Sequence, residues 1–253
     1  PDEQKNIPHH FVQHISVVTP YSVGNFEAEA LQKINELHNT HETVILVGGS
    51  GLYTQAVLRG LDTFPKVLTG IREKLNRVFE EKGITALQAQ LKELDPDYYH
   101  IIDLQNPHRL IRALEVCLSS GKPYSSYLGQ PKAVRPFIPL VVGLKADREI
   151  LYQRINTRVD QMMVHGLLEE VKQLLPYIDY NALQTVGYQE LFEFLKGKCS
   201  LETAVDEIKK NTRRFAKRQL TWYRKSTDVL WFDYQTPHKE IAIALEKQVD
   251  LLK

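Results

Sequence analysis

The chain has 253 residues, 43% of them hydrophobic and 25% charged, which is enough for one large domain or two smaller ones with a substantial core. No apolar run approaches the ~18 residues that a membrane span needs, and the first residues lack the pattern of a signal peptide, so we expect a cytoplasmic protein without a membrane segment. Cys117 and Cys199 are far apart and belong to no CxxC pair, which argues against a disulfide framework or a zinc knuckle.

The net charge of +1 hides an asymmetry. Eight of the 32 Lys and Arg residues, and none of the 31 acidic residues, fall between positions 209 and 225. The rest of the chain therefore carries a net charge of about −7, and the positive charge is concentrated where a polyanion could bind.

The first 25 residues read as irregular. The adjacent His9 and His10 have no His, Cys or carboxylate cluster nearby at ligand spacing, which favours a turn or capping role over a metal site. Apolar residues then recur at helical spacing, and they predict a helix at residues 26–37 that is capped by Ser22 or Asn25.

The segment VILVGGSGLY follows this helix. Its four apolar residues, 44–47, run into Gly48-Gly49-Ser50-Gly51 and then into a segment compatible with a helix, residues 52–58. The pattern predicts a buried strand, a tight turn and a helix, as in a parallel sheet covered on both faces. The glycines would let the backbone approach a ligand closely, but a plain strand-to-helix turn has the same signature, and both interpretations stay open.

The pattern then becomes entirely helical until about residue 118. Breakers at Gly83, Asp95-Pro96 and Asn106-Pro107 divide it into helices at residues 70–82, 84–94 and 107–119. A second apolar strand, IPLVVGL, is predicted only at residues 138–144. The sequence therefore predicts an all-helical domain at residues 66–132, inserted into an α/β core domain made of residues 1–65 and 133–253.

The core domain continues mainly as helices, which we expect at residues 147–163, at residues 167–175, up to Gly197, and at residues 201–223. A turn at residues 183–188 precedes the helix that stops at Gly197, and DVLWFD predicts a third strand at residues 228–233. The predicted fold class is α/β, a parallel sheet flanked by helices with an inserted helical domain.

The helix at residues 201–223 has a basic face. At about 100° per residue, eight side chains fall within an arc of about 140°: Lys210, Arg213, Arg214, Lys217, Arg218, Thr221, Arg224 and Lys225. The opposite side, which we expect to pack, carries Ile208, Phe215, Gln219, Trp222 and Tyr223. A charge run is usually a solvated face, but a merely soluble helix intersperses both signs, so the pattern favours phosphate binding. RNA with unpaired bases is favoured over duplex DNA because no helix-turn-helix or zinc-finger spacing is visible.

A second basic pair, Arg109 and Arg112, lies at the start of the third helix of the inserted domain. Forked guanidinium donors one turn apart could clamp a phosphate backbone. The same spacing also suits surface arginines that pair with Asp103 or Glu115, and the sequence does not decide between these alternatives.

Taken together, these motifs resemble the tRNA dimethylallyltransferase (tRNA isopentenyltransferase) family. The resemblance covers nearly the whole chain, and seven ordered blocks carry it: IPHH, PYSVGNF, LVGGSGLY, DP followed by NPHRLIRALEV, LYQRINTRVDQMM with GLLEEV, LQTVGYQE, and TRRFAKRQLTWYRK. It implies a P-loop-NTPase-like α/β fold. It also implies transfer of a dimethylallyl group from dimethylallyl diphosphate to the exocyclic amine of the adenosine adjacent to the tRNA anticodon, with Mg²⁺ as cofactor.

The resemblance also implies roles for single residues. It assigns neutralisation of the leaving diphosphate to a P-loop, to Mg²⁺ and to an arginine that matches Arg158, with Arg154 as a weaker candidate. Contacts to the anticodon stem-loop are implied for Ser50, Arg72, His108, Arg109, Arg112, Gln184, Thr185, Gly187, Tyr188 and Gln189, to which Lys217 and Arg218 of the basic helix would add. No residue of the chain is predicted to ligate a metal, and we expect a monomer.

The sequence departs from the family pattern in one respect. The family opens with a P-loop of the kind GPTxSGKT and an Asp-Ser-x-Gln segment with the expected general base, and neither occurs in these residues. Because the P-loop follows the central strand of such a sheet, we expect the natural protein to carry roughly 30–45 further N-terminal residues. The 253 residues alone are then expected to bind tRNA weakly and to transfer nothing.

Three other functions compete with this prediction. An adenylate isopentenyltransferase performs the same reaction on a free nucleotide, but so small a substrate has little use for an inserted helical domain or a basic helix. An RNA-binding module without chemistry stays open because of the missing motif. A nucleotide kinase would suit glycine turns and paired arginines, but it leaves the basic helix without a role.

Overall fold

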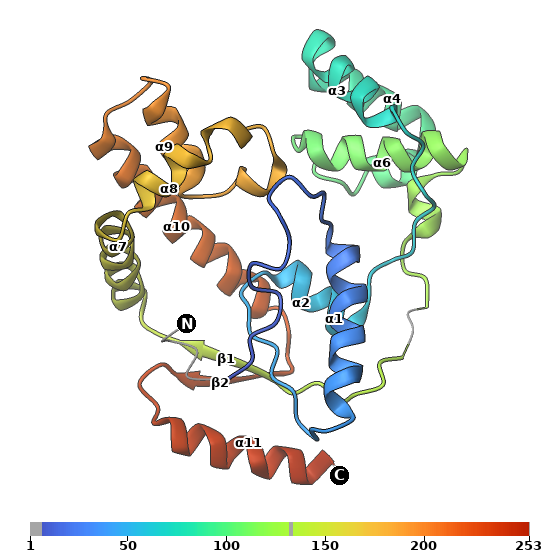
Figure 1. The fold of residues 1–253 in the computed structure, drawn as a ribbon. Helices are drawn as coiled ribbons and strands as arrows, with labels where there is room; N and C mark the ends of the chain where they lie inside the picture. Colours follow the sequence, from blue (N-terminus) through green and yellow to red (C-terminus); the bar gives the residue numbers. More distant parts are fainter. Residues whose placement is uncertain (1–6, 132–133, 253) are drawn as a thin grey trace. The chain divides into compact units, whose positions relative to one another are not determined.

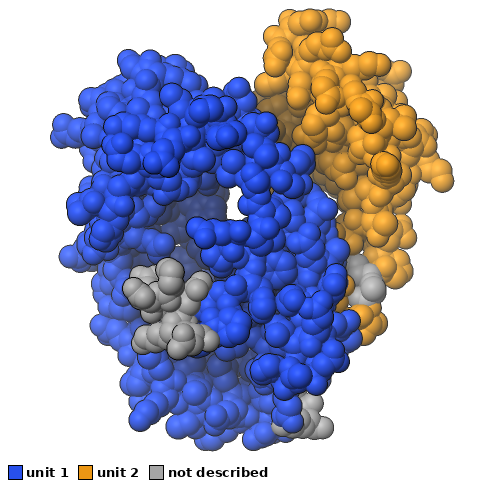
Figure 2. All heavy atoms as spheres, in the orientation of Figure 1, with its two compact units in different colours: residues 1–58, 136–253 blue, residues 59–135 orange. Residues whose placement is uncertain are grey.

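A computed structural model of the protein describes residues 7–131 and 134–252. It divides into two compact units, Pro1–Leu58 with Pro136–Lys253 and, separately, Arg59–Arg135 (Figure 2). The predicted inserted domain falls within the second unit, although its predicted end at residues 132–133 lies outside the described residues. Each unit has its own hydrophobic core.

The unit Arg59–Arg135 is all-helical, as the breakers predicted. Its helices are α3 (Ile71–Lys82), α4 (Ile84–Leu94), the short α5 (Pro96–Tyr99) and α6 (Pro107–Ser120), followed by a 3-10 turn at Tyr124–Tyr127. The helix α6 starts where the Asn106 side chain accepts a hydrogen bond from the backbone of Arg109, and it ends at Gly121 in the left-handed conformation.

Leucines of α3, α4 and α6 fill the core of this unit. Leu87, Leu91, Leu110 and Leu114 are fully buried, and Leu75 is nearly so. At the edge of the core, the buried Asp95 carboxylate accepts hydrogen bonds from the backbone N–H groups of Tyr98 and Ser125, at 3.0 and 2.7 Å, and from the Ser125 hydroxyl. The carboxylate therefore caps α5 and fixes the turn after α6, which explains how a charged group is tolerated there.

The other unit combines helices with a small parallel sheet (Figure 1). Strand β1 (Val141–Lys145) pairs in parallel with β2 (Val229–Asp233), with Val141 opposite Val229. The helices of this unit are α1 (Val23–His38), α2 (Gly51–Arg59), α7 (Arg148–Val164), α8 (Leu167–Gln173), α9 (Tyr188–Leu195), α10 (Leu201–Tyr223) and α11 (His238–Leu252).

The core of this unit lies among α7, α8, α9 and α10. Val159, Val171, Leu191 and Ile208 are buried there, one from each helix. The Ser200 side chain caps α10, and Ser22 caps α1 in a capping box with Asn25, so the predicted capping by Ser22 is confirmed. The predicted irregular start holds from residue 7 to the beginning of α1, and residues 1–6 lie outside the described residues.

The prediction of a buried strand at residues 44–47 is wrong. The segment pairs with no strand in the described part of the chain, and Ile45 and Val47 are 82% and 87% exposed. A strand needs a neighbour for its backbone N–H and C=O groups, and an apolar sequence alone does not supply one. The second predicted strand does form, as β1, but Leu144 is 58% exposed, so it is not buried on both faces.

Among the described residues, none of the helices combines the length and the apolar character that crossing a membrane would require.

Candidate functional site

The basic residues of α10 divide into two groups. In the middle of the helix, Lys209 Nζ lies 2.6 Å from the Asp160 carboxylate, and the Arg213 guanidinium donates to Asn156 Oδ1 at 2.7 Å. Asp160 and Asn156 both belong to α7. Part of the predicted basic face therefore serves the packing of α10 against α7 and is not available to a ligand.

The second half of α10 and the residues just after its end at Tyr223 keep their charge exposed. Arg214, Lys217, Arg218 and Lys225 are exposed, and we call these four residues the cationic ridge. Together with Thr221 and Trp222 they line a shallow hollow of about 410 Å³. No acidic side chain in the described ranges forms an ion pair with the ridge. A concentrated positive charge without an acidic partner attracts phosphate groups.

The other side of this half packs against the glycine turn before α2. A Cβ atom built on Gly49 would lie 2.2 Å from Gln219 Nε2, and one built on Gly51 would lie 2.4 Å from the Trp222 ring. The Thr54 and Tyr223 hydroxyl groups are hydrogen-bonded at 2.8 Å. The glycines thus allow the backbone of the turn to lie close to protein side chains of α10.

The predicted packing of this side is only partly right. Phe215 and Trp222 are 47% and 43% exposed, and the Arg218 guanidinium lies 5.7 Å from the centroid of the Phe215 ring. The aromatic surface therefore continues from the packed side of α10 to the edge of the cationic ridge, where a flat base could stack. Ser50 is exposed at the start of α2, and its carbonyl accepts the Thr54 backbone N–H at 3.0 Å.

The turn at residues 184–189 is held by its own side chains. Gln184 Nε2 donates to the Ile178 carbonyl at 2.7 Å, and Gln189 Nε2 donates to Gln184 Oε1 at 3.0 Å. Thr185 is exposed, and its carbonyl accepts the Gln189 N–H at 3.1 Å. Gly187 adopts a φ of 101°, which a side chain would strain.

Glu190 connects this turn to α10. Its carboxylate accepts the Gly187 N–H at 2.8 Å and the Asn211 Nδ2 group of α10 at 2.7 Å. Asn211 Oδ1 in turn accepts a hydrogen bond from Arg214 of the ridge at 3.3 Å. The turn and the ridge, which are well separated in the sequence, are therefore linked by hydrogen bonds.

Tyr188 anchors the turn on its other side. Its hydroxyl donates to the Glu170 carboxylate of α8. Burial, reinforced by that acidic neighbour, raises the pKa of Tyr188 to about 12. The side chain therefore stays neutral at ordinary pH and acts here as a hydrogen-bond donor.

Arg154 and Arg158 are exposed and lie one turn apart on α7. The Arg154 guanidinium lies 5.4 Å from the centroid of the Tyr234 ring, just after β2. Asn156 and Asp160 face α10. Each is two positions from Arg158, and two positions correspond to a rotation of about 200° around the helix axis. The arginines therefore lie on a different side of α7 from the contact with α10, and the structure does not bring them together with the cationic ridge.

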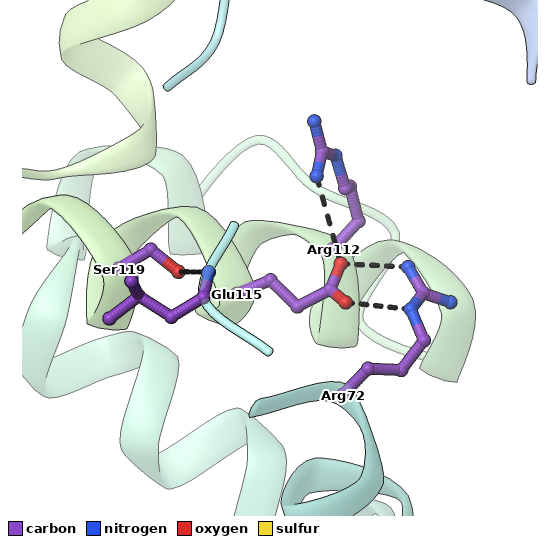
Figure 3. A network of polar contacts seen from close by, with 5 residues as sticks. Arg72, Arg112, Glu115 and Ser119 are labelled. Carbon is purple, nitrogen blue, oxygen red and sulfur yellow. Dashed lines mark hydrogen bonds and ion pairs between the residues drawn. The ribbon is translucent and has the colours of Figure 1, made fainter. Parts of the chain in front are cut away.

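In the other unit, Arg72 is fixed by the carboxylate of Glu115, a pairing that the sequence did not predict. Arg72 of α3 donates from Nε and Nη2 to both oxygens of Glu115, at 2.6 and 2.7 Å, and Arg112 Nη1 lies 3.7 Å from Glu115 Oε2 (Figure 3). The ion pair between Arg112 and Glu115 was one of the open alternatives. His108 and Arg109 are exposed in the first turn of α6.

No group of three or more His, Cys, Asp or Glu side chains that could hold a metal ion occurs in the described ranges. His9 Nδ1 lies 2.8 Å from the Ile7 carbonyl, which is a local turn contact.

Comparison with known proteins gives one consistent family. A model of the family described as IPP transferase matches residues 1–226. The tRNA dimethylallyltransferase of Christiangramia forsetii is 54% identical over 249 residues, which cover 98% of this chain and 82% of that relative. The tRNA dimethylallyltransferase of Flavobacterium johnsoniae is 51% identical over 246 residues, covering 95% of this chain and 80% of the relative.

Solved structures agree with the sequence relatives. The full-length tRNA isopentenylpyrophosphate transferase from Bacillus halodurans has a TM-score of 0.68 at 33% identity, covering 98% of this chain and 79% of that chain. A eukaryotic dimethylallyltransferase, solved acting on tRNA, has a TM-score of 0.81 at 27% identity and covers 100% of this chain and 68% of that chain. With its mixed α/β architecture and its match over most of its length, this chain belongs to the IPP transferase family, the family of the tRNA dimethylallyltransferases.

Proposed function

We propose that this protein transfers a dimethylallyl group from dimethylallyl diphosphate to the exocyclic amine of the adenosine adjacent to the anticodon of a tRNA. The observation that carries the proposal is the 54% identity to a tRNA dimethylallyltransferase over 98% of the chain. The fold supports it, because a eukaryotic dimethylallyltransferase acting on tRNA matches the whole chain with a TM-score of 0.81.

The reaction sets clear demands on the site. The bond between the allylic carbon and the diphosphate oxygen breaks, the diphosphate leaves with the electron pair, a carbon–nitrogen bond forms, and the amine loses a proton. Because an exocyclic adenine amine is a weak nucleophile, the allylic carbon must develop cationic character, and the leaving diphosphate must be neutralised. We assign part of this neutralisation to Arg158 and a smaller part to Arg154, whose guanidinium is already placed over Tyr234.

We also propose that Mg²⁺ accompanies the diphosphate. Mg²⁺ is commonly bound through one or two carboxylates together with substrate phosphates. The diphosphate is therefore expected to supply the main ligands of the ion.

Recognition of tRNA is assigned to positively charged and hydrogen-bonding surfaces. The cationic ridge, with Lys217 and Arg218 at its centre, offers charge to the RNA backbone, and the turn at residues 184–189 is linked to it through Glu190 and Asn211. Ser50, together with Arg72, His108, Arg109 and Arg112 of the helical unit, completes the proposed set of contacts. Phosphate contacts fix register, whereas the adenine is selected by being drawn out of its stack.

The experiment is a transfer assay with the full-length product of the reading frame. Labelled dimethylallyl diphosphate and Mg²⁺ are supplied with an anticodon stem-loop RNA, with the same RNA carrying guanosine at the target position, or with AMP. We expect label on the adenosine-containing RNA alone, because a guanosine offers no exocyclic amine at that ring position.

Each other outcome identifies a competing function. Transfer to AMP at a rate equal to that on RNA would make the protein an adenylate isopentenyltransferase. Tight RNA binding without any transfer would make it an RNA-binding module.

The proposed ion is tested by adding excess chelator, which should abolish transfer, and then by adding Mg²⁺, which should restore it.

A further inference from the structure

Glu115 of α6 is a buried acid on which two arginines converge. It is 2% exposed, and both of its carboxylate oxygens are engaged by Arg72 from α3. Arg112, one turn earlier on α6, approaches Oε2 of the same carboxylate at 3.7 Å (Figure 3). A buried carboxylate is costly unless it is paired, so this geometry is strongly fixed.

The arginines themselves are accessible. The Arg72 and Arg112 side chains are 52% and 41% exposed, against 3% for the carboxylate between them. Two of the five N–H groups of Arg72 contact Glu115, and the described residues offer this guanidinium no other hydrogen-bond partner. The group can therefore accept a further anion without releasing Glu115.

Arg112 is held from a second direction. Its guanidinium lies 5.3 Å from the centroid of the Phe64 ring, which stacks on Tyr124 with centroids 4.7 Å apart and an interplanar angle of 17°. One turn beyond Glu115, the Ser119 hydroxyl accepts the Leu68 N–H at 3.1 Å. The α6 face formed by residues 112, 115 and 119 thus fixes the segment from Phe64 to Arg72.

We propose that Glu115 is a positioning residue that orders Arg72 and Arg112 into one binding site for an RNA phosphate. The three side chains together carry a net charge of +1, which matches one phosphodiester. Ordering the two long side chains in advance removes part of the entropy that binding would otherwise cost. The role deepens the proposed function and rests on it, because the phosphate belongs to the tRNA substrate.

Positioning and simple charge make opposite predictions for Glu115→Gln. Removing a negative charge next to two arginines should tighten RNA binding if charge alone matters. If the carboxylate orders the arginines, its loss should weaken binding, because the neutral amide cannot hold two guanidinium groups in place. The sign of the change therefore separates the two explanations.

The measurement is the dissociation constant of the full-length protein for an anticodon stem-loop at several salt concentrations. We expect Glu115→Gln to weaken binding by about tenfold, the loss expected for one charge-assisted hydrogen bond. The matched control is Glu73→Gln, an exposed acid next to Arg72 on α3, which should leave binding unchanged or slightly tighter. The kcat at saturating RNA and the KM for dimethylallyl diphosphate should not move.

A double-mutant cycle tests whether Glu115 acts through Arg72. In an Arg72→Gln background, the effect of Glu115→Gln should shrink, because the guanidinium that it orders is gone. Arg72→Lys keeps the charge but removes the planar fork, and we expect it to weaken binding as well. This second variant changes only the half-exposed partner, so it tests the proposal even if Glu115→Gln does not fold.

Melting curves by circular dichroism set a temperature at which every variant is folded. If Glu115→Gln binds RNA as tightly as the wild type or more tightly, or if Arg72→Lys behaves as the wild type, the positioning role is refuted. If the wild type itself neither binds nor prenylates the stem-loop, the proposed function fails instead, so the two failures are distinguishable.

Discussion

Arg158 lies on an exposed side of α7, and no hydrogen bond or ion pair joins it to another described residue. Arg154, one turn earlier, is already engaged by the face of Tyr234. Of the two, we therefore expect Arg158 to direct more of its charge toward the diphosphate. The charge on the leaving diphosphate develops in the transition state. An arginine that donates hydrogen bonds to this group should therefore raise kcat more than it raises the affinity for substrate.

We expect Arg158→Ala to lower kcat by about a hundredfold, the loss typical of one stabilising donor at a developing charge, while the KM for RNA stays the same. Arg154→Ala should have a smaller effect. Steady-state kinetics with varied RNA and varied dimethylallyl diphosphate measure both. The control is Lys172→Ala, which removes an exposed cation of α8 that pairs with Glu169. If Arg158→Ala leaves kcat unchanged, Arg158 does not belong to the active site.

Single residues also show how far the sequence could predict the site. The ion pair between Arg112 and Glu115 was foreseeable because the two residues lie three positions apart on one helix. The pairing of Arg72 with Glu115 was not, because it joins residues 43 positions apart and depends on how α3 packs on α6. The same holds for Glu190 and Asn211, which come together only when α9 packs against α10.

At the scale of elements, α10 has two parts with different tasks. Its middle packs on α7 through Lys209 and Arg213, and its second half, together with Lys225 just beyond its end, carries the cationic ridge. Periodicity predicted the helix and its basic face. It could not predict which basic residues pack and which stay exposed, because the partners Asp160 and Asn156 lie on another helix. The ridge should therefore account for more of the RNA affinity than an equal number of basic residues in the middle of the helix.

Replacing Lys217 and Arg218 together by alanine should weaken stem-loop binding and flatten its salt dependence. Two lost phosphate contacts reduce the slope of log K against log salt by about 1.5. The affinity for dimethylallyl diphosphate should be nearly unchanged. The control is Lys196→Ala with Lys198→Ala, an exposed pair in which both ammonium groups already form ion pairs with Glu193. An equal loss of both affinities would mean that the ridge serves the diphosphate or the fold.

The predicted elements differ in how well they match the structure, for a physical reason. Helices satisfy their own backbone hydrogen bonds, so capping residues such as Ser22 and Asn106 determine them locally. A strand depends on a distant partner, and the apolar segment at residues 44–47 has none among the described residues. The amphipathic α11 was overlooked in the sequence although its pattern is local.

At the scale of the whole molecule, the described residues form two separate cores. One is built from α7, α8, α9 and α10, and the other from α3, α4 and α6. Turn and breaker residues predicted the helices of the second core, because a run of helices with apolar faces has to bury those faces against one another. Units with their own cores unfold with their own free energies unless they are strongly coupled.

Leu114→Ala should therefore destabilise the unit Arg59–Arg135 selectively. The side chain is fully buried, so its truncation should cost about 3 kcal/mol in the free energy of unfolding of that unit. Hydrogen exchange followed by mass spectrometry should show faster exchange in α3, α4 and α6, with little change in α9 and α10. Leu118→Ala, on the same helix but 41% exposed, is the matched control. Equal acceleration in both units would show that the protein opens as a single cooperative body.

The contact between the glycine turn and the end of α10 has a practical consequence. Trp222 rests on Gly51 and also lines the hollow beside the cationic ridge, with 43% of its surface in contact with solvent. The second tryptophan of the chain, Trp231, lies in β2 against Gly143. The indole at position 222 is thus an intrinsic fluorophore at the proposed docking surface, and the protein carries an optical reporter of nucleic-acid occupancy without any added label.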